Sequence, residues 1–307
     1  MKTEAWIQKN IPSMAGKTVA ISGATGGLGQ ELCRHLASLG ADLLLLDRNS
    51  ERSNAWIKKL KTEFPALNAR HLRLDLADFS TVRSVTEYLL TSPPAYLIFN
   101  AGAYHIPRFT CNTGHDNVFQ INFVAPYYMA RTLLPAIKAR SGRIVAVGSI
   151  AHNYSHIDLE DIEFLTRSQS SKVYGNAKRF LMFSLFGLGE SKTVTVAHPG
   201  ITLTNITAHY PKVIYALIRH PMKVIFMSPR RASLSILAAM VQDTEKNEWF
   251  GPCLFDIWGL PKKKLLKTCS ADEAAEICQE TDKMFEKLQK TVKIDDFRSF
   301  PLTNRQK

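Results

Sequence analysis

The sequence predicts a doubly wound α/β domain, in which helices cover both faces of a parallel sheet. Short apolar runs alternate with longer segments of helical periodicity, and these runs lack the in-and-out alternation of half-exposed strands. A cluster of glycines also joins the first apolar run to the first helical segment. Parallel strands require crossover helices, which bury both faces of the sheet. We therefore expect residues 1–307 to form one domain with a C-terminal helical extension.

Each element follows from its own pattern of residues. The apolar runs predict strands at Thr18–Ser22, Asp42–Leu46, Ala69–Leu74, Tyr96–Phe99, Arg143–Val147 and Thr193–Ala197. The segments between them predict helices at Leu28–Leu39, Ser50–Thr62, Ser80–Thr91, His115–Ala139 and Lys172–Glu190. Near the C-terminus, Ser270 and Glu273 have the spacing of a capping box, in which each side chain bonds the other's backbone amide. This pattern predicts a structural closing helix at residues 270–292.

Composition and charge limit the classes of protein to consider. The chain has 45% hydrophobic and 21% charged residues, with a formal net charge of +12. A basic face suits an anionic cofactor, a membrane surface or nucleic acid, but no arginine-rich arm, zinc finger or RNA-binding aromatic signature favours nucleic acid. The five scattered cysteines form no CxxC pair, which indicates free thiols, a reducing compartment and no metal site. Without an apolar leader or a run of 18 apolar residues, the expected location is cytoplasmic.

The glycine-rich turn reads ISGATGGLG from Ile21 to Gly29. It lies between a strand and a helix, where glycines let the backbone approach a pyrophosphate at the helix N-terminus. The glycine spacing is GxxxGxG, and a tight structural turn is the alternative. We favour a dinucleotide site in a Rossmann-type sheet, with contacts from Ser22, Gly23, Thr25, Gly26, Gly27, Leu28 and Gly29.

The second strand ends in Asp47 and Arg48, at the position that meets the adenine ribose in this fold. A carboxylate there can bond the ribose 2′-hydroxyl of NAD and would repel a 2′-phosphate, whereas an arginine can accept the 2′-phosphate of NADP. The pair favours NAD narrowly over NADP. The alternative is that Asp47 and Arg48 only begin a turn and contact no nucleotide.

Four polar residues later in the chain are candidates for acid–base chemistry. Tyr174 and Lys178 are four residues apart and share a helix face, where an ammonium would lower the pKa of the phenol. Ser149 follows the fifth strand and could bond a substrate oxygen that Tyr174 protonates or deprotonates. Taken singly, Tyr174 and Lys178 could form an ordinary helix face, Ser149 a cap and Asn122 a satisfied buried amide.

Together these residues resemble the short-chain dehydrogenase/reductase family. The match extends from about Lys17 to Thr204 and includes the glycine turn, Asp75, Asn100-Ala101-Gly102, Asn122, Ser149, Tyr174, Lys178 and Pro199-Gly200. The resemblance implies that Tyr174 is the general acid–base, Lys178 lowers its pKa and bonds the nicotinamide ribose, Ser149 orients the substrate, and Asn122 holds a relay water. It also implies that the remaining cofactor contacts are Asp75, Leu76, Asn100, Ala101, Gly102, Pro199, Gly200, Thr202 and Thr204.

Further details resemble retinol dehydrogenases and their relatives, a branch that mostly acts on lipophilic alcohols and carbonyls. These are the segment RIVAVGSIAH, the acidic insert before Tyr174, the segment AHPGITLTN and the long region after Asn205. Three positions depart from that pattern: Ser22 replaces threonine, Gly148 replaces serine, and Asp47 replaces a neutral residue. The last departure weakens the NADP preference that the branch implies.

The resemblance places residues 206–230 at the family's substrate-covering lid. This segment is apolar and basic, which suits a lipophilic substrate, a membrane surface or simple packing against the core or another subunit. Trp258 and Lys262–Lys264 are possible interfacial anchors for peripheral membrane contact. A homodimer or homotetramer is also expected from the family. The main alternative function is a nucleotide-binding regulatory protein that has lost catalysis, which usually lacks the tyrosine or the lysine.

Overall fold

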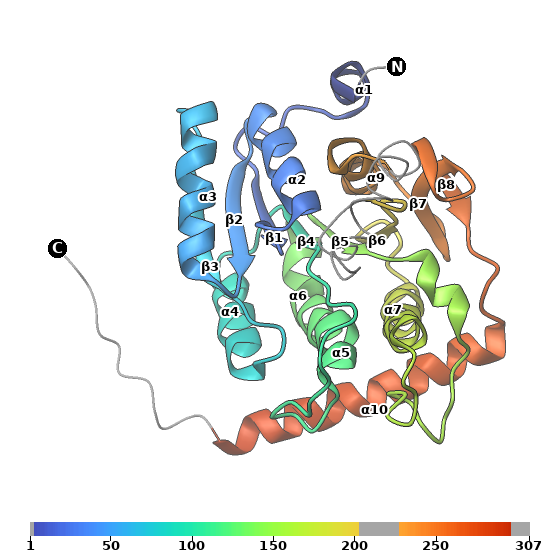
Figure 1. Cartoon of the computed structure of the whole chain (residues 1–307). Coiled ribbons are helices and arrows are strands. Elements are labelled where there is room, and N and C mark those ends of the chain that lie inside the picture. Colours follow the sequence, from blue (N-terminus) through green and yellow to red (C-terminus); the bar gives the residue numbers. More distant parts are fainter. Residues whose placement is uncertain (1–2, 203–226, 296–307) are drawn as a thin grey trace, which may run out of the picture.

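A computed structural model describes residues 3–202 and 227–295, and for 291–295 it describes the backbone alone. Its strands form one sheet of eight in the order β3-β2-β1-β4-β5-β6-β7-β8 (Figure 1). Pairs from β3 through β7 are parallel, and β7 with β8 is antiparallel. The strands are β1 Thr18–Ser22, β2 Asp42–Asp47, β3 Ala69–Arg73, β4 Tyr96–Phe99, β5 Arg143–Val147, β6 Val194–Ala197, β7 Glu248–Leu254 and β8 Trp258–Leu265.

The doubly wound class is confirmed, and the six expected strands are present within one residue of their expected ends. The sequence analysis missed β7 and β8, because β7 contains Gly251 and Pro252 and β8 contains Pro261 and three lysines. Glycine, proline and lysine are all depleted in strands. The sheet is therefore parallel except at this edge, where β8 returns antiparallel to β7.

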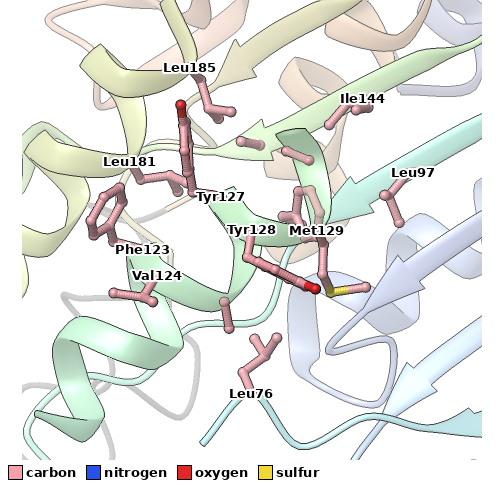
Figure 2. Close-up of a cluster of buried hydrophobic side chains, with 14 of the residues drawn as sticks. Leu76, Leu97, Phe123, Val124, Tyr127, Tyr128, Met129, Ile144, Leu181 and Leu185 are labelled. Atoms are coloured by element: carbon pink, nitrogen blue, oxygen red, sulfur yellow. The ribbon is translucent and has the colours of Figure 1, made fainter. Parts of the chain in front are cut away.

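Helices cover both faces of the sheet, as the unbroken apolar runs predicted. Successive residues of a strand enter opposite clusters: Leu43 and Leu45 face α1, α2, α3 and α9, while Leu44 and Leu46 face α4, α6, α7 and α10. Figure 2 shows part of the second cluster, with Tyr127 and Tyr128 of α6 beside α7 and the strands. The helices are α1 Thr3–Asn10, α2 Gly27–Ser38, α3 Ser50–Glu63, α4 Phe79–Thr91, α5 Asn117–Phe119, α6 Ala125–Ala139, α7 Ser170–Gly187, α9 Pro229–Val241 and α10 Ala271–Asp295.

Several helices differ from the expected elements. The single helix expected at His115–Ala139 is α5, a π-helical turn at Gln120–Val124 (η1), and α6. The N-terminal helix α1 was not expected. The expected lid at residues 206–230 overlaps α9, because Ser228 is the N-cap of α9 and Pro229 its first residue. Residues 203–226 lie outside the described residues. They include most of the expected lid and the expected cofactor contact Thr204.

No helix in residues 3–202 and 227–295 is long and apolar enough to span a membrane. The expected membrane anchors Trp258 and Lys262–Lys264 lie on β8 at the edge of the sheet. Near them, Phe255 at the end of the β7–β8 hairpin is 91% exposed. Peripheral membrane contact stays a prediction, as does the oligomeric state.

The C-terminal helix α10 packs against α6 and α7 (Figure 1). Half of its expected capping box is present, because the Ser270 hydroxyl accepts a hydrogen bond from the Glu273 amide at 3.1 Å. The Glu273 carboxylate turns toward α7 and receives Arg179 Nε at 2.7 Å and the Ile157 amide at 3.0 Å. Burial raises the pKa of Glu273, but the hydrogen bonds from Arg179 and Ile157 outweigh it and hold the pKa at about 2.

This depressed pKa predicts an acid-sensitive attachment of α10. Because the pKa of Glu273 falls from 4.5 to about 2 on folding, its contribution to stability is present above the unfolded pKa and is lost as the pH falls toward 2. The difference in Tm between wild type and Glu273→Gln should therefore be largest near neutral pH and shrink on acidification, as measured by calorimetry. A difference that does not change with pH would contradict this origin of the stability.

Candidate active site

The candidate site lies where the direction of strand order reverses, between β1 and β4. Ligands of open α/β sheets bind at such a point, beyond the carboxyl ends of the strands. Two polar side chains join these strand ends. The buried Ser22 hydroxyl accepts hydrogen bonds from the amides of Asn100 and Ala101, each at 3.1 Å. In return, the Asn100 side chain donates to the carbonyls of Ser22 at 3.1 Å and Gly23 at 2.9 Å. Ser22 and Asn100 thus hold the turn in shape.

Two glycines of the turn allow contacts that no side chain would permit. Gly23 has φ +67°, and a Cβ placed there would lie 2.9 Å from Ala101 Cα. A Cβ on Gly29 would lie 2.2 Å from the Gly23 carbonyl oxygen. The turn therefore folds tightly over β4 and back onto α2, as a close approach to a pyrophosphate requires.

The N-terminus of α2 has the chemistry of an anion site. Gly26 is its N-cap, with φ −74° and ψ 163°, and makes no side-chain cap hydrogen bond. The first backbone amides of a helix have no partner within the helix, and most N-caps use a side-chain oxygen to accept from one of them. Here the first turn begins Gly27-Leu28-Gly29 and contains no acidic residue. The amide donors and the positive end of the helix dipole suit a phosphate at this position.

Asp47 lies at the end of β2, beneath the same turn. Its carboxylate accepts from the Thr25 hydroxyl at 3.3 Å and from the Ser53 hydroxyl at 3.2 Å. Burial raises the pKa of Asp47, and these hydrogen bonds oppose the shift. Arg48 is exposed, and Arg52 donates to the Thr25 carbonyl at 3.0 Å. One carboxylate and two guanidinium groups therefore border the expected position of the adenine ribose.

Asp75 and Leu76 follow β3 on the adjacent side of the site. The Asp75 carboxylate accepts from the Ala77 amide at 3.0 Å, which orders this turn. Leu76 is buried, and its carbonyl accepts from Gln120 Nε2 at 3.0 Å. The turn is thereby connected to the π-helical segment that carries Asn122.

The side chain of Lys178 extends from α7 to the end of β5. Its side chain is buried, and Nζ donates to the Val147 carbonyl at 2.8 Å. A Cβ on Gly102 would lie 3.7 Å from Nζ, so the turn after β4 borders the same ammonium. Burial lowers the pKa of Lys178 to about 8.

Tyr174 lies close to both Ser149 and Lys178. The Ser149 hydroxyl accepts from the Ala151 amide at 3.1 Å, so the expected capping role is also present. Lys178 Nζ lies 5.8 Å from the centroid of the Tyr174 ring. Burial raises the pKa of Tyr174 to about 12, while a hydrogen bond with Ser149 acts in the opposite direction. The lowered tyrosine pKa predicted from the sequence is not found, because desolvation of the phenolate dominates.

Asn122 is fully buried in the π-helical turn, where its side chain is satisfied by the protein. Nδ2 donates to the carbonyls of Ala103 and Val118, each at 2.8 Å, and Oδ1 accepts from the Ala103 amide at 3.1 Å. A Cβ on Gly102 would lie 2.9 Å from Oδ1. The side chain of Asn122 therefore fixes the segment after β4, and its role in holding a relay water stays a prediction.

The loop after β6 contains Pro199, Gly200 and Thr202, three of the expected cofactor contacts. Gly200 has φ +81°, and a Cβ there would lie 2.8 Å from the Ile257 carbonyl oxygen. Pro199 is buried, and Thr202 forms an isolated bridge with Met227. Gly148 also has a packing reason, because a Cβ there would lie 2.8 Å from Met182 Sδ.

Sequence reasoning missed three residues of this region. Tyr104 packs edge-on against Tyr174, with ring centroids 5.4 Å apart. Arg52 and Ser53 contact the glycine turn and Asp47 as described above. Tyr104 directly follows the Asn100-Ala101-Gly102 motif, which was the available signal. No comparable signal identified Arg52 and Ser53, because they lie on a helix face whose contacts depend on the fold.

Comparison with known proteins agrees with this architecture. Residues 17–159 match the model of the short chain dehydrogenase family. Human retinol dehydrogenase 13 is 30% identical over 208 residues, which are 64% of this chain and 62% of that protein. Mouse retinol dehydrogenase 14 is 30% identical over 263 residues, 78% of this chain and 79% of that protein. A crystal structure of an uncharacterised Mycobacterium paratuberculosis protein has a TM-score of 0.71 at 24% identity, covering 91% of this chain and 96% of that one.

The fold is that of a dinucleotide-binding domain, and the similarity to mouse retinol dehydrogenase 14 extends over most of both chains. This chain belongs to the short-chain dehydrogenase family of NAD(P)-dependent oxidoreductases. It spans 62% of the length of human retinol dehydrogenase 13.

Proposed function

We propose that the protein transfers a hydride between NAD(P) and a lipophilic alcohol or carbonyl compound, with Tyr174 as the general acid–base. The observation that carries this proposal is the convergence of Ser149, Tyr174 and Lys178 beside the dinucleotide turn. When bound, the nicotinamide supplies or accepts the hydride. The protein supplies the orientation of the substrate and the proton.

The proton chemistry follows from the three side chains. Ser149 hydrogen-bonds the phenol of Tyr174, so both hydroxyls can contact one substrate oxygen. The raised pKa keeps the phenol of Tyr174 protonated at neutral pH, as protonation of a carbonyl oxygen during reduction requires. Lys178 brings a cation close to the Tyr174 ring, and a charge there stabilises the phenolate that remains after the proton has left. The Val147 carbonyl fixes the position of that ammonium.

The same residues that shape the glycine turn would hold the cofactor. The amides at the start of α2 would bind the pyrophosphate, because Gly26 offers them no side-chain acceptor. Gly23, Gly27, Leu28 and Gly29 would contact it through their backbone. Asp75, Leu76, Asn100, Ala101 and Gly102 would line the adenosine side, and Pro199, Gly200, Thr202 and Thr204 the nicotinamide side. Ser22 would act through the shape of the turn.

We propose that NAD is the preferred nucleotide. The Asp47 carboxylate lies beneath Thr25, and a negative charge there opposes a 2′-phosphate. Exposed Arg48 and Arg52 act in the opposite direction, so the preference is expected to be modest, about tenfold, which corresponds to about 1.4 kcal/mol.

The substrate class rests on the relatives. Both relatives described above carry the name retinol dehydrogenase. At the site itself, Tyr104 places a second aromatic ring beside Tyr174. A lipophilic alcohol or carbonyl, such as a retinoid or a steroid, is therefore proposed.

A titration with NADH and NADPH, read by energy transfer from protein fluorescence to the nicotinamide, tests the nucleotide site. We expect tighter NADH binding in wild type and a smaller ratio of the two affinities in Asp47→Asn. This variant removes the charge, while its amide oxygen still accepts from Thr25 and its amide nitrogen can donate to the Ser53 hydroxyl. An unchanged ratio would show that the charge of Asp47 does not set the preference, and tighter NADPH binding in wild type would mean that Arg48 and Arg52 dominate. Binding of neither nucleotide would reject the proposed function.

Turnover measured with retinol, a steroid alcohol and a sugar alcohol then tests the substrate class. Faster turnover of the sugar alcohol would reject the lipophilic assignment. Nucleotide binding without turnover of any alcohol or carbonyl would favour the alternative, a regulatory protein of the same fold.

A further inference from the structure

A buried histidine lies directly behind Ser149. His152 is on the 3-10 turn η2, Ile150–Tyr154, and has no exposed surface. Its Nδ1 lies 2.6 Å from the Ser149 carbonyl oxygen, and its Nε2 lies 2.7 Å from the Thr268 hydroxyl. The sequence gives no signal of this contact, because Thr268 is far away in the chain.

The partners of His152 fix its proton. Burial lowers the pKa of His152, and the nearby Arg179 lowers it further against the effect of the Ser149 carbonyl, so the ring is neutral at physiological pH. A carbonyl can only accept, so Nδ1 must carry the hydrogen and Nε2 must accept from the Thr268 hydroxyl. The ring therefore connects Ser149 to the segment between β8 and α10.

Arg179 holds both ends of this connection. Its guanidinium is almost fully buried and donates to the His152 carbonyl at 3.0 Å and to the Thr268 carbonyl at 2.6 Å. Glu273 at the start of α10 pairs with the same guanidinium. Arg179 follows Lys178 on α7, so the proton-transfer residues and the C-terminal segment share one buried polar network.

We propose that His152 is a positioning residue for Ser149 and that Thr268 fixes the imidazole in the productive tautomer. The Ser149 carbonyl accepts from both the backbone amide and the imidazole of His152, which sets the peptide plane after Ser149. That plane fixes the backbone from which the Ser149 side chain projects, and a displaced hydroxyl slows proton transfer without affecting the nucleotide turn. This inference rests on the proposed function, because it assigns Ser149 to the substrate oxygen.

The first test compares two substitutions of Thr268. Thr268→Val keeps the shape and removes the hydroxyl, whereas Thr268→Ser keeps the hydroxyl. We expect Thr268→Val to lower kcat about tenfold while KM and the NADH dissociation constant change less than about twofold, and Thr268→Ser to retain most of the wild-type kcat. Equal kcat values for the two variants, or parallel losses of kcat and NADH binding, would overturn the proposal.

The second test separates hydrogen bonding from space filling at residue 152. An asparagine amide nitrogen can occupy the position of imidazole Nδ1, and a glutamine amide nitrogen that of Nε2. We expect His152→Asn to retain a higher kcat than His152→Gln, although glutamine is closer to histidine in volume. A residue that only fills space would show the opposite order.

A third measurement does not depend on turnover. The imidazole 15N chemical shifts of the full-length protein should show His152 neutral and protonated at Nδ1, and the Nε2 resonance should move in Thr268→Val. The opposite tautomer would overturn the proposal even in an active enzyme. The expected tautomer in a protein without turnover would instead reject the proposed function, and with it the role of Ser149.

Discussion

Tyr174→Phe is expected to lower turnover by about 10² to 10⁴-fold while leaving nucleotide binding almost unchanged. The range is that of a positioned general acid–base group, which corresponds to about 3–5 kcal/mol in the barrier. The substitution keeps the aromatic ring that packs against Tyr104 and removes only the hydroxyl that bonds Ser149. Steady-state kinetics with the preferred alcohol and a parallel NADH titration measure the two effects separately.

Tyr104→Phe is the matched control for this experiment. Tyr104 lies beside Tyr174, and the substitution removes the same atom from a ring at the same site. We expect its turnover to stay within about threefold of wild type, because no proton transfer depends on that hydroxyl. Equal turnover in wild type and Tyr174→Phe would reject the acid–base assignment. Equal losses in the two variants would assign the hydroxyl groups to substrate packing instead.

The sequence predicted most of the sheet because each buried strand carries its own signal. In β2, four consecutive leucines alternate between two helical layers, so the run is apolar throughout and needs no knowledge of the partner strands. The glycine turn was predictable for a similar reason. Gly23 and Gly29 are required because a side chain at either position would collide with Ala101 or with the turn itself. These glycines therefore occur at a fixed spacing that can be recognised in the sequence.

The rest depends on contacts between residues distant in the chain. The edge strand β8 has the lysines and proline that protect an open edge, so its composition resembles a loop. Glu273 has capping-box spacing, yet Arg179, 94 residues away, attracts its carboxylate. The pKa of Tyr174 was predicted in the wrong direction because sequence spacing gives the distance to Lys178 but not the desolvation of the phenol.

Gly26→Ser is expected to weaken nucleotide binding by about tenfold or more without destabilising the protein. The backbone of Gly26 has φ −74° and ψ 163°, which serine adopts readily, and serine is a better helix N-cap than glycine. Its hydroxyl would accept from an amide in the first turn of α2, one of the donors that we assign to the pyrophosphate. A hydrogen bond to a charged group contributes about 1.5–3 kcal/mol, so the loss of one such donor accounts for the expected effect.

Gly29→Ala is the informative comparison for this prediction. A Cβ at Gly29 would lie 2.2 Å from the Gly23 carbonyl oxygen, so this variant must shift the turn itself and should lose both Tm and nucleotide affinity. In Gly26→Ser, a Cβ lies 3.3 Å from the same oxygen, and only the affinity should fall. If Gly26→Ser binds NADH as tightly as wild type, the amides of α2 do not bind the pyrophosphate. If Gly29→Ala loses both Tm and affinity while Gly26→Ser loses affinity alone, then Gly29 shapes the turn and Gly26 leaves the amides of α2 free to bind the pyrophosphate.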